Sequence, residues 1–346
     1  MFAKNLKYYR LKNNLSKKDL ASMAGISSMA ITHYENGNRK PEMDVIKKLA
    51  SVLNVSVVDF IASRNQSLEF SHEEFRKNSK MSKNRQEYIR ESVEEYFSRF
   101  YDAVEMLGGE VLPEAPEIRK IALSDDVEEN GRALRRYLGI AEKGPVGNLV
   151  EIIENKGVLL YMFDPDESDF SGINGTVCER PYIVVNMKMT AERIRTTIGH
   201  ETAHFAFDWP EDMDDKTKED MATAISGAFL FPKEDAFREL GIRRRAVTTD
   251  MYIVCKEYGI ALSMLVVRAR KCGIISETVF RNYFISRNRN GGAKKERSFI
   301  QAEESRLFEQ LVYRAINEEE ISIHKGAELL KMPYDKVELN CRYAEV

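Results

Sequence analysis

The pattern of apolar residues predicts a strand and then a helix in the middle of the chain. Residues 182–186 are apolar and rich in β-branched side chains, which is typical of a strand. Residues 190–207 carry apolar side chains at helical spacing, namely Ile194, Ile198, Ala203 and Phe207. We therefore expect a helix with one face in a core, directly after the strand.

Residues 1–63 contain short apolar stretches separated by cap and turn signals, which predict five short helices. A capped helix, a glycine break and a second capped helix follow one another in the order of a helix-turn-helix motif. The signals are Ser16, Gly25, Ser27 or Ser28, and the pair Asn36-Gly37.

A longer helix is predicted from residue 84 to residue 107, after a polar segment at residues 64–83 that suits a linker and could also be a cleavage site. The helix carries an apolar stripe, which either forms a dimer seam or docks on its own domain. The stripe consists of Ile89, Val93, Tyr96, Phe100, Val104 and Leu107.

The remaining chain predicts a second, larger domain and a helical tail. A helix rich in small residues begins near residue 218 and ends before Pro232, and residues 254–270 predict a pair of helices. A break at residues 290–298 precedes a tail of one or two helices, one of them at residues 325–330. The predicted fold class is α+β and mostly α, with domains at residues 1–64, 65–108, 109–290 and 291–346.

Charge divides the chain at the first of these boundaries. Residues 1–64 hold 11 Lys and Arg against 5 Asp and Glu, a net charge of +6, whereas the whole chain carries −3 and its remainder therefore −9. A basic module on an acidic body is what phosphate binding at one end predicts. The alternative is a helical bundle that binds protein rather than DNA.

Length and composition exclude several other classes of protein. The 346 residues, 43% of them hydrophobic, suffice for two or three domains, and no stretch approaches a membrane-spanning helix. We see no secretory signal and no glycine-rich loop that would hold a nucleotide cofactor. We therefore expect a cytoplasmic protein whose cysteines are reduced thiols and weak zinc candidates: Cys178, Cys255, Cys272 and Cys341.

The motif His200-Glu201-Thr202-Ala203-His204 lies within the predicted helix 190–207. H-E-x-x-H places two imidazoles one turn apart on one face with a carboxylate beside them, which suits a zinc ion. In such a site the metal lowers the pKa of a bound water, and the carboxylate accepts its proton as the water attacks a carbonyl. His200 and His204 are thus predicted ligands and Glu201 the general base. The alternative is a buried helix whose histidines only pack.

A third ligand must come from another segment, because His33, His72 and His324 lie far from the motif in sequence. The helix of small residues can approach the motif helix closely and would bring a carboxylate to the metal, as in the His, His, Glu sites of thermolysin-like enzymes. The candidates are Glu219 first, then Asp220 and Glu211.

Further short motifs surround H-E-x-x-H between residues 130 and 290. They lie at residues 133–139, Pro145, 157–160, 170–172, 183–186, Arg193, Arg195 and 229–232. With these motifs the segment resembles the ImmA/IrrE family of zinc metallopeptidases. The resemblance implies a zincin-like domain with a small sheet, a Zn²⁺ cofactor, and Glu219 as third ligand, since the family has a Glu thirteen residues before the proline. The family usually has Asn or Asp where this chain has Thr223, and Leu-Gly in place of Thr202-Ala203.

The N-terminal segment closely resembles the Xre/Cro-type repressors, in which the second helix of the motif enters the major groove. The resemblance implies base contacts from that helix and phosphate contacts from flanking basic residues. These repressors commonly have Gln at the position of Lys17, where Lys favours a phosphate contact. The candidates are Ser28, Met29, Thr32 and His33 for bases, and Lys17, Arg39 and Lys40 for phosphates.

Together, these features predict a regulator that binds a double-stranded DNA operator as a homodimer and carries a zinc endopeptidase domain. Stand-alone peptidases of the resembling family cleave a helix-turn-helix repressor. We therefore expect the substrate to be a repressor, either a partner protein or the chain itself. Its cleavage would control mobile-element, phage or stress genes. A substrate segment should add as a strand beside residues 182–186. The alternative is a non-proteolytic regulator or antitoxin-like protein that uses the peptidase fold for sensing or dimerisation.

Overall fold

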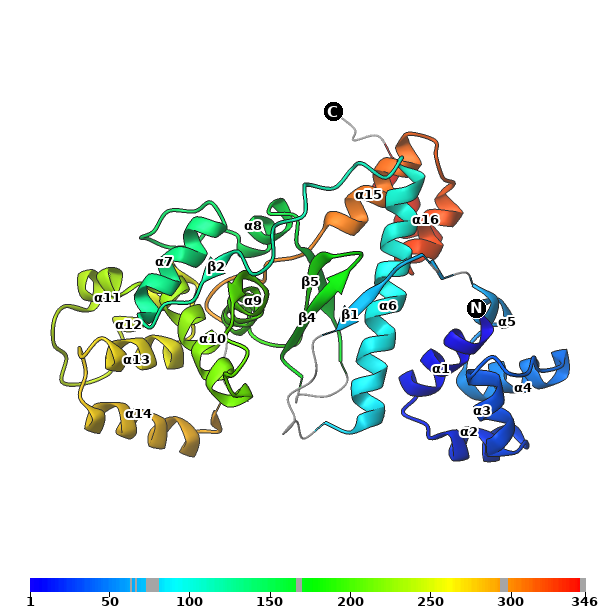
Figure 1. Cartoon of the computed structure of the whole chain (residues 1–346), viewed down its shortest axis with the longest axis horizontal. Helices are drawn as coiled ribbons and strands as arrows, with labels where there is room; N and C mark the ends of the chain where they lie inside the picture. Colours follow the sequence, from blue (N-terminus) through cyan, green and yellow to red (C-terminus); the bar gives the residue numbers. More distant parts are fainter. Residues whose placement is uncertain (63, 66, 73–80, 166–169, 293–297, 343–346) are drawn as a thin grey trace. The chain divides into compact units, whose positions relative to one another are not determined.

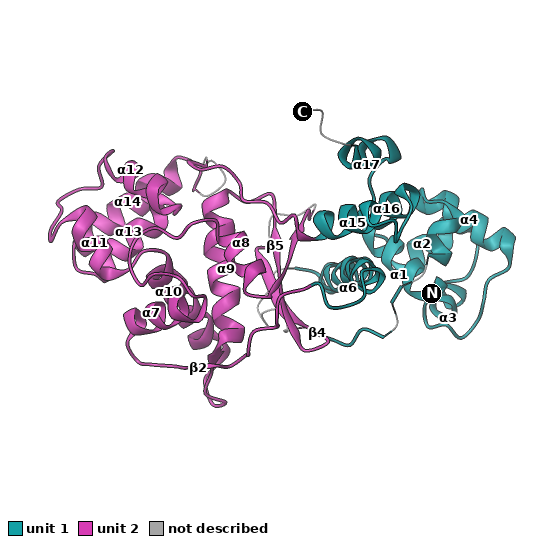
Figure 2. Cartoon of the chain, turned by 90° about the horizontal axis from the view of Figure 1, so that it is seen from above, with its two compact units in different colours: residues 1–70, 77–111, 308–346 teal, residues 71–76, 112–307 magenta. Residues whose placement is uncertain are grey.

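The computed structural model describes the whole chain apart from residues 63, 66, 73–80, 166–169, 293–297 and 343–346. The chain forms two compact units (Figure 2). Unit 1 comprises Met1–Phe70, Lys77–Val111 and Phe308–Val346, and unit 2 comprises Ser71–Arg76 and Leu112–Leu307. The predicted fold class, mostly helical α+β with a small sheet and an N-terminal helix-turn-helix region, is confirmed.

The N-terminal bundle of unit 1 has the five predicted helices. Ser16 caps the second helix in a capping box with Asp19, Gly25 ends that helix at a φ of 67°, and Ser27 caps the third. Buried residues from all five helices share one core, among them Leu6, Leu20, Ile31, Leu49 and Phe60. The helices are α1 (Phe2–Lys12), α2 (Lys17–Ala24), α3 (Ser28–Glu35), α4 (Met43–Leu53) and α5 (Val57–Ile61).

Unit 1 also contains the long helix α6 (Lys83–Met106), against which α1 packs. Four of the six residues of the apolar stripe of α6 are buried inside the unit, and Tyr96 and Leu107 are half-buried. The rings of Tyr96 and Phe100 contact Phe308. The stripe therefore docks on its own unit, the second of the two predicted alternatives. The described residues of the tail form three helices, where one or two were expected: α15 (Leu307–Asn317), α16 (Ile323–Leu330) and α17 (Tyr334–Cys341).

Unit 2 contains a four-stranded sheet with the order β1-β4-β5-β3. The predicted strand is β5 (Arg180–Asn186), which pairs in parallel with β3 (Leu159–Phe163) and antiparallel with β4 (Gly172–Val177). β1 (Phe70–His72) pairs with the outer edge of β4. The sequence did not predict β1, because it lies in the segment interpreted as a linker, whose residues 73–80 are outside the described part. A separate parallel pair joins β2 (Ile121–Ala122) to β6 (Phe207–Asp208).

Helices cover this sheet and extend away from it (Figure 1). The predicted motif helix is α9, which lies against β4 and β5, and α10 packs against α9 and α7. Within the described residues, no helix is both long and apolar enough to cross a membrane. The helices of unit 2 are α7 (Val127–Tyr137), α8 (Leu149–Asn155), α9 (Ala191–Ala206), α10 (Asp215–Leu230), α11 (Lys233–Leu240), α12 (Met251–Tyr258), α13 (Leu262–Lys271) and α14 (Glu277–Arg289).

Buried arginines hold the C-terminal end of α10. Arg135 of α7 donates through Nε to the carbonyl oxygen of Phe229 at 2.7 Å, and Arg268 of α13 donates to that of Phe231 at 2.9 Å. The last carbonyl groups of a helix have no partner within it, so these contacts replace the missing hydrogen bonds. They fix one end of the helix whose other end carries Glu219.

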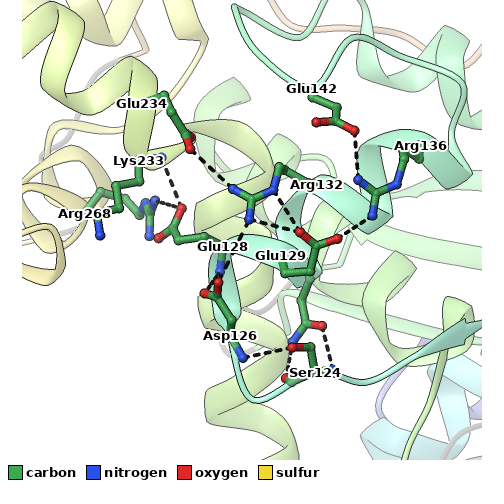
Figure 3. Close-up of polar contacts among 11 residues, drawn as sticks. Ser124, Asp126, Glu128, Glu129, Arg132, Arg136, Glu142, Lys233, Glu234 and Arg268 are labelled. Carbon is green, nitrogen blue, oxygen red and sulfur yellow. Dashed lines mark hydrogen bonds and ion pairs between the residues drawn. The ribbon is translucent and has the colours of Figure 1, made fainter.

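An ion network at the start of α7 adds to this support (Figure 3). Glu128 accepts hydrogen bonds from Arg268 at 2.8 Å and from the backbone N–H of Lys233 at 3.1 Å. Arg132 lies 3.4 Å from Glu234 of α11. Helices α7, α11 and α13 are therefore linked by charged side chains beside the end of α10.

Candidate metal centre and nucleic-acid interface

Small residues bring α10 close to α9, as the sequence predicts, and also to α7. A Cβ atom added at Gly199 of α9 would lie 2.8 Å from Ser226 Oγ, and the Ser226 hydroxyl donates to the carbonyl oxygen of Thr196. A Cβ atom added at Gly131 of α7 would lie 2.8 Å from the Cβ atom of Ala228. This close packing presses α10 against the helix that carries H-E-x-x-H.

Three side chains from these two helices converge. His200 and His204 come from α9, and Glu219 comes from α10. The Nε2 atoms of the two histidines are 3.1 Å apart, and the carboxylate oxygens of Glu219 lie 3.3 Å and 3.5 Å from them. Both histidines are buried, and the side chain of Glu219 is 25% exposed, so the group has a limited opening to solvent.

These separations fit a tetrahedral zinc site. Zinc holds nitrogen and oxygen ligands at about 2.0–2.1 Å, so two ligands on a tetrahedron lie about 3.3 Å apart. The two Nε2 atoms are 3.1 Å apart, and Oε2 and Oε1 of Glu219 lie 3.3 Å from His200 and 3.5 Å from His204, so these distances are close to that value. Two imidazoles and one carboxylate also form a donor set that leaves a fourth position open. The group can therefore hold a metal ion, whereas the alternative ligands Asp220 and Glu211 are exposed and lie outside it.

Two further side chains contact the histidines. Thr223 Oγ1 lies 3.2 Å from His200 Nδ1, the ring nitrogen that does not face Glu219. A partner at that ring nitrogen fixes the orientation of a histidine in metal sites. Trp209 donates its Nε1–H to the backbone carbonyl oxygen of His204 at 3.1 Å, and its ring centroid is 5.9 Å from that of His204. The sequence marked Thr223 only as a departure from the family pattern and gave no role to Trp209.

Glu201, the predicted general base, faces β4. The side-chain amide of Asn174 donates to Glu201 Oε2 at 2.8 Å, and Asn174 is 4% exposed. A Cβ atom at Gly172 would lie 3.2 Å from Glu201 Oε1, so the glycine leaves room for the carboxylate. Asn174 was not identified from the sequence as a partner of Glu201. The only indication was the presence of an asparagine within a strand, where this residue type is uncommon.

The expectation that a substrate segment adds beside residues 182–186 is wrong. These residues belong to β5, which has hydrogen-bonded neighbours, β3 and β4, on its two sides. A peptide adds only to a strand with a free edge. The strand that contacts Glu201 is β4, and its outer edge is paired with β1.

The helix-turn-helix motif presents one face of α3 to solvent. The predicted base-contacting residues Ser28, Met29 and His33 are exposed, whereas the opposite face of the helix is buried. Thr32 is half-buried, and its hydroxyl donates to the carbonyl oxygen of Ser28 at 3.1 Å. The accessible face of α3 thus carries both polar and apolar side chains.

The predicted phosphate-contacting residues have different surroundings. Arg39 and Lys40 are exposed after the end of α3. Lys17 Nζ lies 3.6 Å from Glu35, which also accepts a hydrogen bond from Arg10 Nη2 at 3.0 Å. Arg10 and Glu35 join α1 to α3 and so position the exposed face.

The N-terminal segment is similar to known proteins. A family model described as Helix-turn-helix matches residues 6–60. An uncharacterized HTH-type transcriptional regulator of Bacillus subtilis (strain 168) is 35% identical over 57 residues, which are 16% of this chain and 49% of that protein, so the chain spans about half of it. A second one, from Methanocaldococcus jannaschii, is 37% identical over 54 residues, 16% of this chain and 82% of that protein. No solved structure matches the chain.

Proposed function

The chain belongs, through its N-terminal segment, to the helix-turn-helix family, and from this premise we propose a DNA-binding transcriptional regulator whose second unit is a zinc-dependent endopeptidase. The proposed substrate is a repressor, either a partner protein or the chain itself, whose cleavage changes the expression of mobile-element, phage or stress genes. The observation that carries the proposal is the convergence of His200, His204 and Glu219 on the helix face beside Glu201.

This convergence favours a metal centre over histidines that only pack in a core. A packed histidine needs one hydrogen-bond partner for each ring nitrogen, whereas here two Nε2 atoms and a carboxylate from another helix meet within 3.5 Å. A shared cation would satisfy all three of these ligand atoms at once. A zincin-like fold and the domain boundaries 1–64, 65–108, 109–290 and 291–346 are part of the same proposal.

The side chains have distinct roles in the proposed peptide hydrolysis. Zinc, when bound, would supply Lewis acidity, which polarises a peptide carbonyl and makes water acidic enough to lose a proton near neutral pH. Glu201 accepts that proton as the water oxygen bonds to the carbonyl carbon, and it returns a proton to the amine as the C–N bond breaks. Asn174 donates a hydrogen bond to Oε2 of Glu201 and so orients the carboxylate that accepts the proton.

The DNA-binding part of the proposal concerns a double-stranded operator read by a homodimer. The exposed face of α3 would contact bases, and basic residues beside it would contact phosphates. The proposed base contacts are Ser28, Met29, Thr32 and His33, and the proposed phosphate contacts are Lys17, Arg39 and Lys40.

The test compares the zinc-loaded full-length protein with its Glu201→Gln variant. Glutamine keeps the size of the side chain and can accept the hydrogen bond from Asn174, but it cannot act as a base. We expect the wild type to cleave itself or fluorescein-labelled casein, and the variant to retain zinc and DNA binding while cleaving neither. Intact-mass spectrometry and fluorescence release measure the two reactions.

Equal cleavage by both proteins would contradict the role of Glu201. A wild type that holds zinc and cleaves neither probe would contradict the endopeptidase and favour the non-proteolytic regulator, in which the second unit serves sensing or dimerisation.

A further inference from the structure

The outer edge of β4 is occupied by a segment of the chain itself. β1 follows the helix-turn-helix segment in sequence, and its residues Ser71 and His72 belong to unit 2. β4 is also the strand that contacts Glu201, through Asn174. The strand beside the candidate base therefore has both of its edges filled, one by β5 and one by β1.

Two contacts fit β1 to this position. The carbonyl oxygen of Ser71 occupies the space that a Cβ atom at Gly175 would fill, so the glycine permits the close approach of the two backbones. His72 Nδ1 lies 2.5 Å from the hydroxyl of Tyr182, a fully buried side chain. Gly175 and Tyr182 are direct neighbours across β4 and β5. Both contacts thus converge on one point of the sheet, next to Asn174.

The filled edge is the one that a substrate would need. An extended peptide binds a sheet by adding a strand to a free edge, where its main chain supplies most of the hydrogen bonds. Both sides of β5 are paired, and β3 is separated from β4 by β5. A peptide that pairs with the sheet beside Glu201 must therefore take the place of β1.

We propose that β1 is an intramolecular competitor of the substrate. The segment after the helix-turn-helix region closes the edge of β4, and the edge opens when this segment is withdrawn. The substrate class is an extended peptide that pairs with β4 through its main chain. The inference rests on the proposed function, because it takes β4 as the substrate-binding strand. Protection of a sheet edge against aggregation is the competing explanation for β1.

The test uses the full-length chain with Glu201→Gln, so that cleavage cannot interfere. Successive residues of a strand direct their N–H groups to opposite sides, and proline has no N–H. Ser71→Pro combined with His72→Pro therefore removes one N–H that faces β4, whichever way β1 is aligned. Ser71→Ala combined with His72→Ala keeps both N–H groups and is the matched control for loss of the side chains.

Two measurements report whether the outer edge of β4 is open. Hydrogen exchange reports on the amides of residues 172–177, and fluorescence anisotropy reports the binding of a labelled peptide that copies residues 65–76. In the proline variant we expect faster exchange at β4, unchanged exchange between β3 and β5, and peptide binding roughly tenfold tighter or more than in the parent and the alanine control.

Equal peptide affinity in the three proteins would overturn the proposal. Faster exchange at β4 without peptide binding would also overturn it, because β1 would then only cover the edge. Neither measurement needs a metal or a cleavage reaction. Failure of zinc binding or of cleavage in the Glu201 experiment would count against the proposed function. It would not change the hydrogen exchange or the peptide affinity measured here, so the two failures can be told apart.

Discussion

The helix-turn-helix surface and the candidate metal centre present their functional side chains in opposite ways. On α3, the candidate residues come from one short helix and are mostly exposed. At the candidate metal centre, His200, Glu201 and His204 are each 8% exposed, and the third donor comes from a second helix. A surface that contacts DNA needs accessible groups on a rigid support, whereas a metal centre needs donors that converge and are shielded. Substitutions should therefore damage the two regions separately.

The largest expected effect breaks the DNA-binding region and spares the metal centre. Arg10 and Glu35 are nearly fully buried, with side chains 3% and 2% exposed. Removing one partner of a buried ion pair costs about 3–5 kcal/mol, because the other charge is left buried. Arg10→Ala should thus unfold the bundle in denaturant titrations and abolish DNA binding while metal content stays the same. Lys12→Ala, an exposed site on the same helix, is the control. Loss of metal together with DNA binding would show that the two regions depend on each other.

Low pH should reduce the stability of unit 1 by protonating Glu95 of α6. Burial raises the pKa of Glu95, but Arg99 and Lys331 outweigh it and lower the pKa to about 2, from 4.5. Because the folded pKa is the lower one, the carboxylate stabilises unit 1 above about pH 4.5, and this stabilisation disappears as the pH falls towards 2. It amounts to roughly 3 kcal/mol.

Glu95→Gln should therefore lower the free energy of unfolding at pH 7 and leave it nearly unchanged at pH 2. Urea titrations followed by circular dichroism at both pH values measure this difference. The same loss at both pH values would show that the charge of Glu95 is not the source of the stabilisation.

A smaller effect weakens the metal centre and spares DNA binding. Thr223→Val keeps the shape of the side chain but removes the hydroxyl beside His200 Nδ1. Loss of such a partner typically lowers metal affinity about 10–100-fold. Zinc titrations can use the fluorescence of Trp209, the single tryptophan, which lies beside His204. Thr223→Ser restores the hydroxyl and should bind zinc nearly as the wild type does; equal affinities of the valine and serine variants would refute the contact.

The smallest effect concerns the exposed basic residues. Arg39→Ala and Lys40→Ala should each lower the slope of log affinity against log salt concentration by about one for non-specific duplex DNA. Fluorescence anisotropy at several salt concentrations measures the slope. Lys256→Ala, an exposed site on α12, is the control and should leave it unchanged. An unchanged slope in the two test variants would remove these residues from the interface.

Features with local causes were predictable from the sequence. The capping serines, Gly25 and the H-E-x-x-H spacing each act within one helix, and the structure has those helices at nearly the expected residues. The small residues of α10 indicated that a carboxylate from this helix would approach the histidines, and the family resemblance pointed to Glu219 ahead of Asp220 and Glu211.

Features that depend on strand pairing were not predictable. Asn174 reaches Glu201 only because β4 pairs with β5 beside α9, and β1 meets β4 about a hundred residues further along the chain. The substrate was expected beside β5 for the same reason. The apolar pattern identifies β5 as a strand, but it does not show that β3 and β4 pair with both of its sides. Thr223 was recognised as unusual, yet its role required the position of the His200 ring.

We propose that unit 2 binds a metal ion whether or not unit 1 binds DNA. Elemental analysis of the purified wild type and of His204→Ala, with DNA binding measured on the same samples, decides this. We expect about one zinc ion per chain in the wild type, little or none in the variant, and equal DNA binding by both. If the wild type, after incubation with zinc and removal of unbound metal, held no zinc while still binding DNA, the proposed metal centre would be wrong.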